Sequence, residues 1–237
     1  MLSLGLARVA EQAALASASL IGRGDEKAAD QAAVNAMREQ LNLLDIAGVV
    51  VIGEGERDEA PMLYIGEEVG TGNGPGVDIA LDPLEGTTLT AKDMPNALTV
   101  IAMGPRGSML HAPDVYMDKL AIGPGYSEGL VSLDMPPATR VSALATEKGC
   151  APSDITVCIL ERPRHEEMIA EVRSTGAFSA ESPMVTCGWR HALREAHVNR
   201  HLTCIWARGG RTRAGCSCAC CAEMYGPVPD SGRCCPQ

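Results

Sequence analysis

Hydrophobic residues follow two different periods along the first 177 positions of the chain. One stretch is rich in Ala and Leu without proline, and the next repeats apolar residues every three to four positions, as a helix face does. Four short β-branched runs predict buried strands instead. The predicted helices are Leu4–Ser19, about Lys27 to Leu44, and His165–Arg173, and the predicted strands are Gly48–Gly53, Val77–Leu81, Ala97–Met103 and Ile155–Leu160.

This alternation of helices and strands is the pattern of an α/β or layered α+β domain. At 237 residues, 46% of them hydrophobic, the chain is long and apolar enough for one sizeable globular domain. Its formal net charge of −10 argues against nucleic acid or an anionic membrane as a partner, because both require a basic surface. No apolar run approaches the ~20 residues of a membrane span, and the first residues lack a secretion-signal pattern. We therefore expect a cytoplasmic protein.

Acidic residues follow the first two predicted strands. Gly53 to Glu59 holds four acids in six residues, and Asp82-Pro-Leu-Glu-Gly-Thr-Thr88 comes after the second strand. There, Asp82 and Glu85 can converge on one cation, while the Gly86 and Thr87 backbone can hold a phosphate. Taken alone, each segment is also typical of a solvated turn or a capped β-turn. Together they predict a two-metal phosphoryl site, whose carboxylate oxygens suit Mg²⁺ or Mn²⁺.

Seven motifs give residues 1–177 a close resemblance to one known family. They are Gly22–Asp25, Ala29–Met37, Val51–Glu56, Asp58–Gly66, Val77–Thr87, Ala112–Met117 and Pro163–His165. In these motifs the chain resembles the bacterial class II fructose-1,6-bisphosphatases, including Glu85 where the wider sugar and inositol phosphatase superfamily usually has Asp. The resemblance implies the layered α/β fold of the fructose-1,6-bisphosphatases and inositol monophosphatases.

The same resemblance implies roles for individual positions. Asp30 and Glu54 match one metal site, and Asp82 with Glu85 matches most of a second; Asp30 alone would be taken for a solvated helix residue. The Glu85-Gly86-Thr87 segment matches the family segment that binds the phosphate to be hydrolysed. Thr87 and Asp58 match residues that orient or activate the attacking water. The positions that match the holders of the sugar and its distal phosphate are Tyr116, Arg162, Pro163 and Arg164.

The reaction implied by the family is metal-dependent hydrolysis of the 1-phosphate of fructose 1,6-bisphosphate. This step belongs to gluconeogenesis or a reductive pentose phosphate cycle, and sedoheptulose 1,7-bisphosphate is a second candidate substrate. The resemblance also implies a homo-oligomer in intact members. An inositol- or nucleotide-phosphate phosphatase of the same superfamily is the alternative.

The last 60 residues have a different composition from the rest. They contain eight of the ten cysteines, both tryptophans, the only phenylalanine, seven Arg and no Lys. They also lack the family's Asp-Gly-Asp turn and its Gly-Gly-Ala-Pro-Glu-Gly segment, whose Glu completes the second metal site. We therefore divide the chain into residues 1–177, the N-terminal part of a sugar-phosphatase domain, and residues 178–237, a tail that we expect to be disordered.

Two hidden motifs suggest how this tail arose. Ser179 to Cys187 can be encoded so that reading from the third base gives Arg-Arg-Ile-Thr-Asp-Gly-Asp-Val. Thr203 to Arg208 can be encoded so that the same offset gives Leu-Tyr-Met-Gly-Thr. Both are family motifs in the expected order, so a frameshift near Ala177 is predicted, with the family's C-terminal half out of frame and activity impaired.

The competing hypothesis is a non-catalytic protein with a Cys-rich metal-binding tail. Cys216-Ser-Cys-Ala-Cys-Cys221 and Cys234-Cys235 could supply thiolates to Zn²⁺ or Cu(I). The tail lacks the paired Cys-x-x-Cys spacing of structural zinc sites, so the frameshift hypothesis is favoured.

Overall fold

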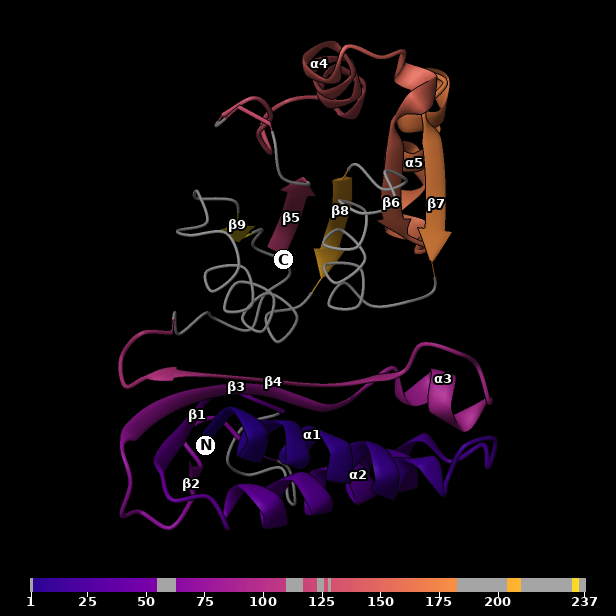
Figure 1. Ribbon diagram of the computed structural model, residues 1–237. Coiled ribbons are helices and arrows are strands. Elements are labelled where there is room, and N and C mark those ends of the chain that lie inside the picture. The colour runs from indigo at the N-terminus through magenta and orange to yellow at the C-terminus, as the bar shows by residue number, and fades with distance from the viewer. Residues whose placement is uncertain are drawn as a thin grey trace. The chain divides into compact units, whose positions relative to one another are not determined.

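The computed structural model describes residues 2–54, 63–109, 117–122, 126–127, 129–182, 204–209 and 232–234. These residues form two compact units, one from the described residues up to position 109 and the other from those after position 116 (Figure 1). The sequence analysis predicted no division at this place. Both units combine helices with a sheet, so the predicted α/β architecture is confirmed.

Two adjacent helices open the first unit. Helix α1 (Leu2–Ala18) and helix α2 (Glu26–Leu41) lie side by side against one face of a sheet (Figure 1). Asp25 begins α2, because its carboxylate accepts a hydrogen bond from the Ala28 N–H at 2.9 Å. Small buried residues, Ala13 on α1 and Ala29 and Ala33 on α2, belong to the shared core. Both helices confirm the sequence prediction.

The sheet of the first unit has the order β2-β1-β3-β4. Its strands are β1 (Ala47–Ile52), β2 (Glu68–Val69), β3 (Gly76–Glu85) and β4 (Leu98–Pro105), and a short helix, α3 (Thr87–Ala91), follows β3. Only β1 and β3 run parallel; β2 and β4 are antiparallel to their neighbours. Strand β3 is buried over most of its length, with Ile79, Ala80 and Leu81 fully covered.

The prediction of a buried strand at Ala97–Met103 is wrong in one respect. Strand β4 lies there, but of its residues only Ala102 is buried. The reason is its position at the edge of the four-stranded sheet, where one neighbour is absent among the described strands. An apolar run alone does not distinguish a central strand from an edge strand.

The second unit has a five-stranded sheet of order β7-β6-β8-β5-β9. Its core contains Val157 and Ile159 of β6 together with apolar residues of two helices. The elements are β5 (Met117–Ile122), α4 (Pro137–Lys148), β6 (Thr156–Leu160), α5 (Glu166–Ser174), β7 (Phe178–Ser182), β8 (Cys204–Gly209) and β9 (Gly232–Cys234). Strands β6, β7 and β8 run parallel, and β5 is antiparallel to β8 and β9.

Three of these strands lie in the tail that sequence analysis separated from the rest. Strand β7 continues from Ala177, and β8 lies between β6 and β5. The other tail residues lie outside the described residues, so the division at Ala177 stays a prediction. Among the residues that the structure describes, no helix is long and apolar enough to cross a bilayer.

Candidate metal and phosphate site

Four acidic residues of the first unit come from neighbouring elements. Asp30 lies on α2, Glu54 follows β1, and Asp82 and Glu85 lie in β3. In the parallel pairing of β1 and β3, Ile52 stands opposite Ala80, so Glu54 and Asp82 are each two residues beyond a matched pair. Register therefore brings together two carboxylates that are 28 positions apart in the sequence.

The electrostatics of Glu54 show that the four carboxylates are neighbours. Burial raises the pKa of Glu54 to about 7, with further increases from the negative charges of Asp30 and Glu85. A hydrogen bond with the Asp82 side chain acts in the opposite direction. Burial also raises the pKa of Asp30. Like charges on half-buried and buried acids are costly without a counter-charge, which makes this cluster a functional candidate.

A close backbone contact fixes the position of Glu54. Its N–H donates to the Leu63 carbonyl at 3.0 Å, and Leu63 is fully buried. At Gly53 a Cβ atom would lie 2.2 Å from the same carbonyl oxygen, so no other residue fits there without a shift. The sequence analysis used Gly53 only as the end of a strand. Its packing role could not be predicted, because Leu63 comes close only in the folded chain.

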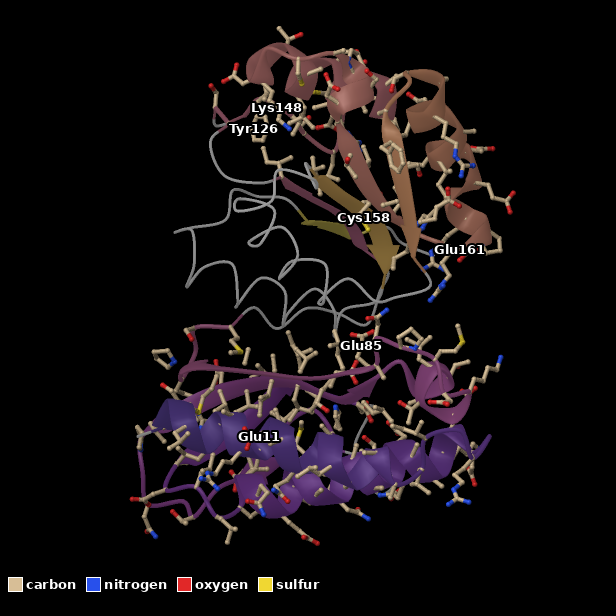
Figure 2. The ribbon with its side chains drawn as sticks, turned by 45° about the vertical axis from the view of Figure 1, so that its right-hand side comes forward. Glu11, Glu85, Tyr126, Lys148, Cys158 and Glu161 are labelled. Carbon is tan, nitrogen blue, oxygen red and sulfur yellow. The ribbon has the colours of Figure 1, made fainter. Side chains whose placement is uncertain are left out.

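An irregularity in the pairing of β3 precedes Glu85 and affects the direction of its side chain. The pairing of β3 with β4 shifts between Asp82 and Glu85, and the Thr99 hydroxyl donates to the Pro83 carbonyl at 3.0 Å inside that irregularity. Glu85, labelled in Figure 2, ends the strand with its side chain buried. Because its side chain lies in the protein interior rather than in solvent, Glu85 differs from an ordinary acidic turn residue.

Gly86 and Thr87 form the turn after Glu85. Gly86 has φ +96°, a left-handed conformation that favours glycine, and α3 begins at the next residue. Thr87 is half-buried, and the Gly86 carbonyl accepts from the Thr90 N–H at 3.1 Å. A left-handed turn at a helix start is a type of backbone that can offer N–H groups to a phosphate oxygen.

Buried acceptor atoms of the cluster fit a cation. Oε2 of Glu54 is buried and has no hydrogen-bond partner among the described residues. Carboxylate oxygen is the donor that Mg²⁺ and Mn²⁺ prefer. However, no group of three or more His, Cys, Asp or Glu side chains in the described part of the chain is placed so that it could hold a metal ion as it stands. The four carboxylates are thus neighbours from which a metal site could be completed.

The arginine motif belongs to the second unit. Arg162, Pro163 and Arg164 follow β6, and a single 3-10 turn (Pro163–His165) leads into α5. Pro163 and Arg164 are exposed, and Arg162 is half-buried. His165 fixes this turn to the end of β6, because its side chain is buried and its Nδ1 lies 2.7 Å from the Leu160 carbonyl oxygen. Asp58 and Tyr116 lie outside the described residues.

Half-buried and buried carboxylates beside the ends of neighbouring strands in an α/β protein are compatible with metal-ion catalysis of phosphate chemistry. Comparison with known families is more specific. The model of the bacterial fructose-1,6-bisphosphatases, glpX-encoded, matches residues 1–181, and the chain belongs to this family. The predicted family is therefore confirmed, and it is a metal-dependent one.

Curated relatives agree with the family match. The chain is 53% identical over 175 residues to fructose-1,6-bisphosphatase 1 class 2 of Escherichia coli K12, covering 74% of this chain and 52% of that protein. It is 50% identical over 169 residues to the D-fructose 1,6-bisphosphatase class 2/sedoheptulose 1,7-bisphosphatase of Synechococcus sp. CC9902, covering 71% and 50%. The chain thus spans about half the length of the curated relatives it matches.

Proposed function

We propose that the protein is a metal-dependent sugar-bisphosphate phosphatase that removes the 1-phosphate of fructose 1,6-bisphosphate in the cytoplasm. The observation that carries this proposal is the group of four neighbouring carboxylates around the half-buried Glu54, in a chain of the bacterial fructose-1,6-bisphosphatase family. A low-dielectric acidic cluster suits cations that accompany a phosphate ester, because the cations offset the charge of both.

Asp30, Glu54, Asp82 and Glu85 would hold Mg²⁺ or Mn²⁺. When bound, such ions neutralise the phosphate and lower the pKa of a coordinated water. The buried Oε2 of Glu54 supports this assignment, since this one carboxylate oxygen has no hydrogen-bond partner in the described residues and could bind a cation. Proximity of the other carboxylates raises the cost of leaving the site without positive charge.

The remaining residues divide into a reacting end and a retaining end. At the reacting end, Glu85 and the turn Gly86-Thr87 would grip the phosphate that leaves, and Thr87 with Asp58 would orient the attacking water. At the retaining end, Tyr116 would contact the sugar, and the turn Arg162-Pro163-Arg164 would hold the distal phosphate. Guanidinium groups suit a phosphate that stays bound, because their planar donors pair with two oxygens at once.

Sedoheptulose 1,7-bisphosphate is a second substrate in this proposal. The names of two relatives, from Synechococcus sp. CC9902 and Prochlorococcus marinus NATL1A, include both activities, and each is 50% identical to this chain over 169 residues. The two substrates share the phosphorylated end that reacts. The proposed sites in residues 1–177 would therefore serve either one, in gluconeogenesis or in a reductive pentose phosphate cycle.

The chain as written is proposed to have little of this activity. The family match ends at residue 181, and the tail lacks the Asp-Gly-Asp turn and the Glu of Gly-Gly-Ala-Pro-Glu-Gly. A metal site short of one carboxylate and a sugar held on one side only would each lower the rate. Together they could cost several powers of ten, at about 1.4 kcal/mol per tenfold.

Phosphate release from fructose 1,6-bisphosphate with Mn²⁺ or Mg²⁺ tests the function. We expect measurable turnover after the reading frame is restored beyond Ala177 and at least a hundredfold less from the 237-residue chain, a loss of about 2.7 kcal/mol or more. In the restored protein Asp82→Asn should remove most activity while the fold persists, because the amide keeps the volume but loses the charge. Near-normal turnover by that variant would contradict the metal assignment, and preference for an inositol or nucleotide phosphate would contradict the substrate.

A further inference from the structure

A side-chain ion pair joins helix α2 to the turn that precedes β2. The Nε of Arg38 donates to Oε1 of Glu67 at 2.6 Å, and the Nη2 of Arg38 donates to Oε2 at 3.1 Å. One guanidinium thus binds both oxygens of one carboxylate, which is the strongest geometry for such a pair. The side chain of Arg38 is 25% exposed and that of Glu67 is 12% exposed. Solvent therefore screens this ion pair less than one on the open surface.

Glu67 also holds together the turn formed by residues 64–67, which we call the Glu67 turn. Its Oε2 accepts a hydrogen bond from the Tyr64 N–H at 3.2 Å, and its own N–H donates to the Tyr64 carbonyl at 3.0 Å. Gly66, with φ +88°, allows the sharp reversal between these residues. The carboxylate of Glu67 therefore connects the backbone of this turn to the side chain of Arg38.

The Glu67 turn is hydrogen-bonded to β1. The Gly66 N–H donates to the Val50 carbonyl at 2.7 Å, and the Val50 N–H donates to the Glu67 carbonyl at 3.0 Å. One residue before the turn, the Leu63 carbonyl accepts from the Glu54 N–H at 3.0 Å. A displacement of the turn would therefore disturb the contact that holds the Glu54 backbone.

Arg38 lies on the helix that carries Asp30. The two residues are eight positions apart on α2, which is about 12 Å along one rigid element. The ion pair with Glu67 therefore links the element that carries Asp30 to the segment that holds Glu54. Both acids belong to the proposed metal site, although they come from different elements of the first unit.

We propose that Arg38 and Glu67 are a positioning pair that fixes the spacing between Asp30 and Glu54. The effect passes through the Glu67 turn, so loss of the pair loosens the Glu54 backbone while the pairing of β3 with β4 stays intact. This inference rests on the proposed function in that Asp30 and Glu54 are taken as ligands of a cation. Ligands with a variable spacing bind a cation more weakly, because they must be ordered when it binds.

Hydrogen exchange of single amides, measured by NMR on the full chain with a chelator, tests the positioning without metal. Arg38→Met keeps the apolar stem of the side chain but removes its charge. Glu67→Gln keeps an acceptor for the Tyr64 N–H but removes the opposite charge. In both variants the Glu54 amide should exchange at least fivefold faster, whereas the amides of β3 keep their wild-type rates. Arg38→Lys, which keeps the charge without the paired donors, should lie between wild type and Arg38→Met.

Mn²⁺ binding by the full chain, measured by titration calorimetry, separates this inference from the proposed function. Arg38→Met and Glu67→Gln should each bind Mn²⁺ at least fivefold more weakly than wild type. A wild-type chain that binds no Mn²⁺ would contradict the metal assignment of the proposed function. The exchange rate of the Glu54 amide would still decide whether the ion pair has a positioning role.

Controls distinguish a local effect from a general loss of stability. Arg8→Met and Glu39→Gln, exposed changes on α1 and α2, should match wild type in both measurements. The double variant Arg38→Met/Glu67→Gln leaves neither charge unpaired, so it should fold even if a single variant does not. Its Glu54 amide should also exchange faster than in wild type. A wild-type exchange rate at Glu54 in Arg38→Met, or an equal acceleration in β3, would overturn the inference.

Discussion

The two units of the molecule differ in which parts of the sequence build their sheets. In the first unit all four strands come from residues 47–105, inside the segment that matches the family. In the second unit, β8 lies between β6 and β5 although it comes from residues 204–209, beyond that segment. A changed tail therefore alters the middle of one sheet while leaving the pairings of the other intact.

The chemistry divides along the same line. The first unit contains the carboxylates and the Gly86-Thr87 turn, whereas the second contains the arginine turn that is proposed to retain the distal phosphate. Variants in the first unit should change the reacting end, and variants in the second should change substrate grip or the stability of its sheet. Three experiments, from the largest expected effect to the smallest, examine this division.

A proline in β8 should destabilise the sheet of the second unit and leave the stability of the first sheet unchanged. Trp206 pairs with Leu120 of β5 and Ile159 of β6, so Trp206→Pro introduces a residue that cannot donate to either ladder. We expect a loss of about 3 kcal/mol or more, confined to the second unit. Hydrogen exchange should then accelerate in β6 but not in β3. Unchanged protection of β6 would mean that the tail contributes nothing to the fold, as the prediction of a disordered tail requires.

Glu54 should make the free energy of unfolding of the first unit depend on pH when a chelator keeps the protein free of metal. Its folded pKa of about 7 lies above the ordinary 4.5, so the folded state holds the extra proton and stability falls as pH rises between these values. The difference between these two pKa values corresponds to a change of about 3 kcal/mol in the free energy of unfolding. Glu54→Gln should remove this dependence and stabilise the metal-free protein at pH 8 but not below 4.5.

Thermal unfolding at several pH values measures this effect. Glu68→Gln is the matched control, because Glu68 is exposed on the neighbouring strand β2. If wild type and Glu54→Gln lose stability in parallel between pH 4.5 and 7, Glu54 is not buried among charges, and the candidate site loses its main support.

The arginine turn should show the smallest effect and a distinct kinetic signature. In the frame-restored protein, Arg164→Ala should raise KM for fructose 1,6-bisphosphate about tenfold and change kcat much less, because the distal phosphate is bound similarly in ground and transition states. Arg23→Ala, in the first unit, serves as the control. A collapse of kcat at constant KM would place Arg164 at the reacting end and remove the proposed difference between the units.

The sequence by itself determined the order and type of half of the α-helices and strands that the structure describes. Periodicity located α1, α2 and α5 to within about three residues, and it located β1, β3, β4 and β6 as strands. It also indicated Asp82 and Glu85 as acids near a strand end, but the predicted turn from Asp82 was wrong, because β3 continues through both residues to Glu85. These features are local, and neighbouring residues suffice to define them.

Only the tertiary structure decided which residues meet. The parallel register of β1 and β3 matches Glu54 with Asp82, and the packing of α2 brings in Asp30, which no local pattern separated from a solvated helix residue. The same holds for the edge position of β4, for Gly53 against the Leu63 carbonyl, and for the division into two units. Each depends on contacts between segments far apart in the chain, whose free energy exists only once the sheets have formed.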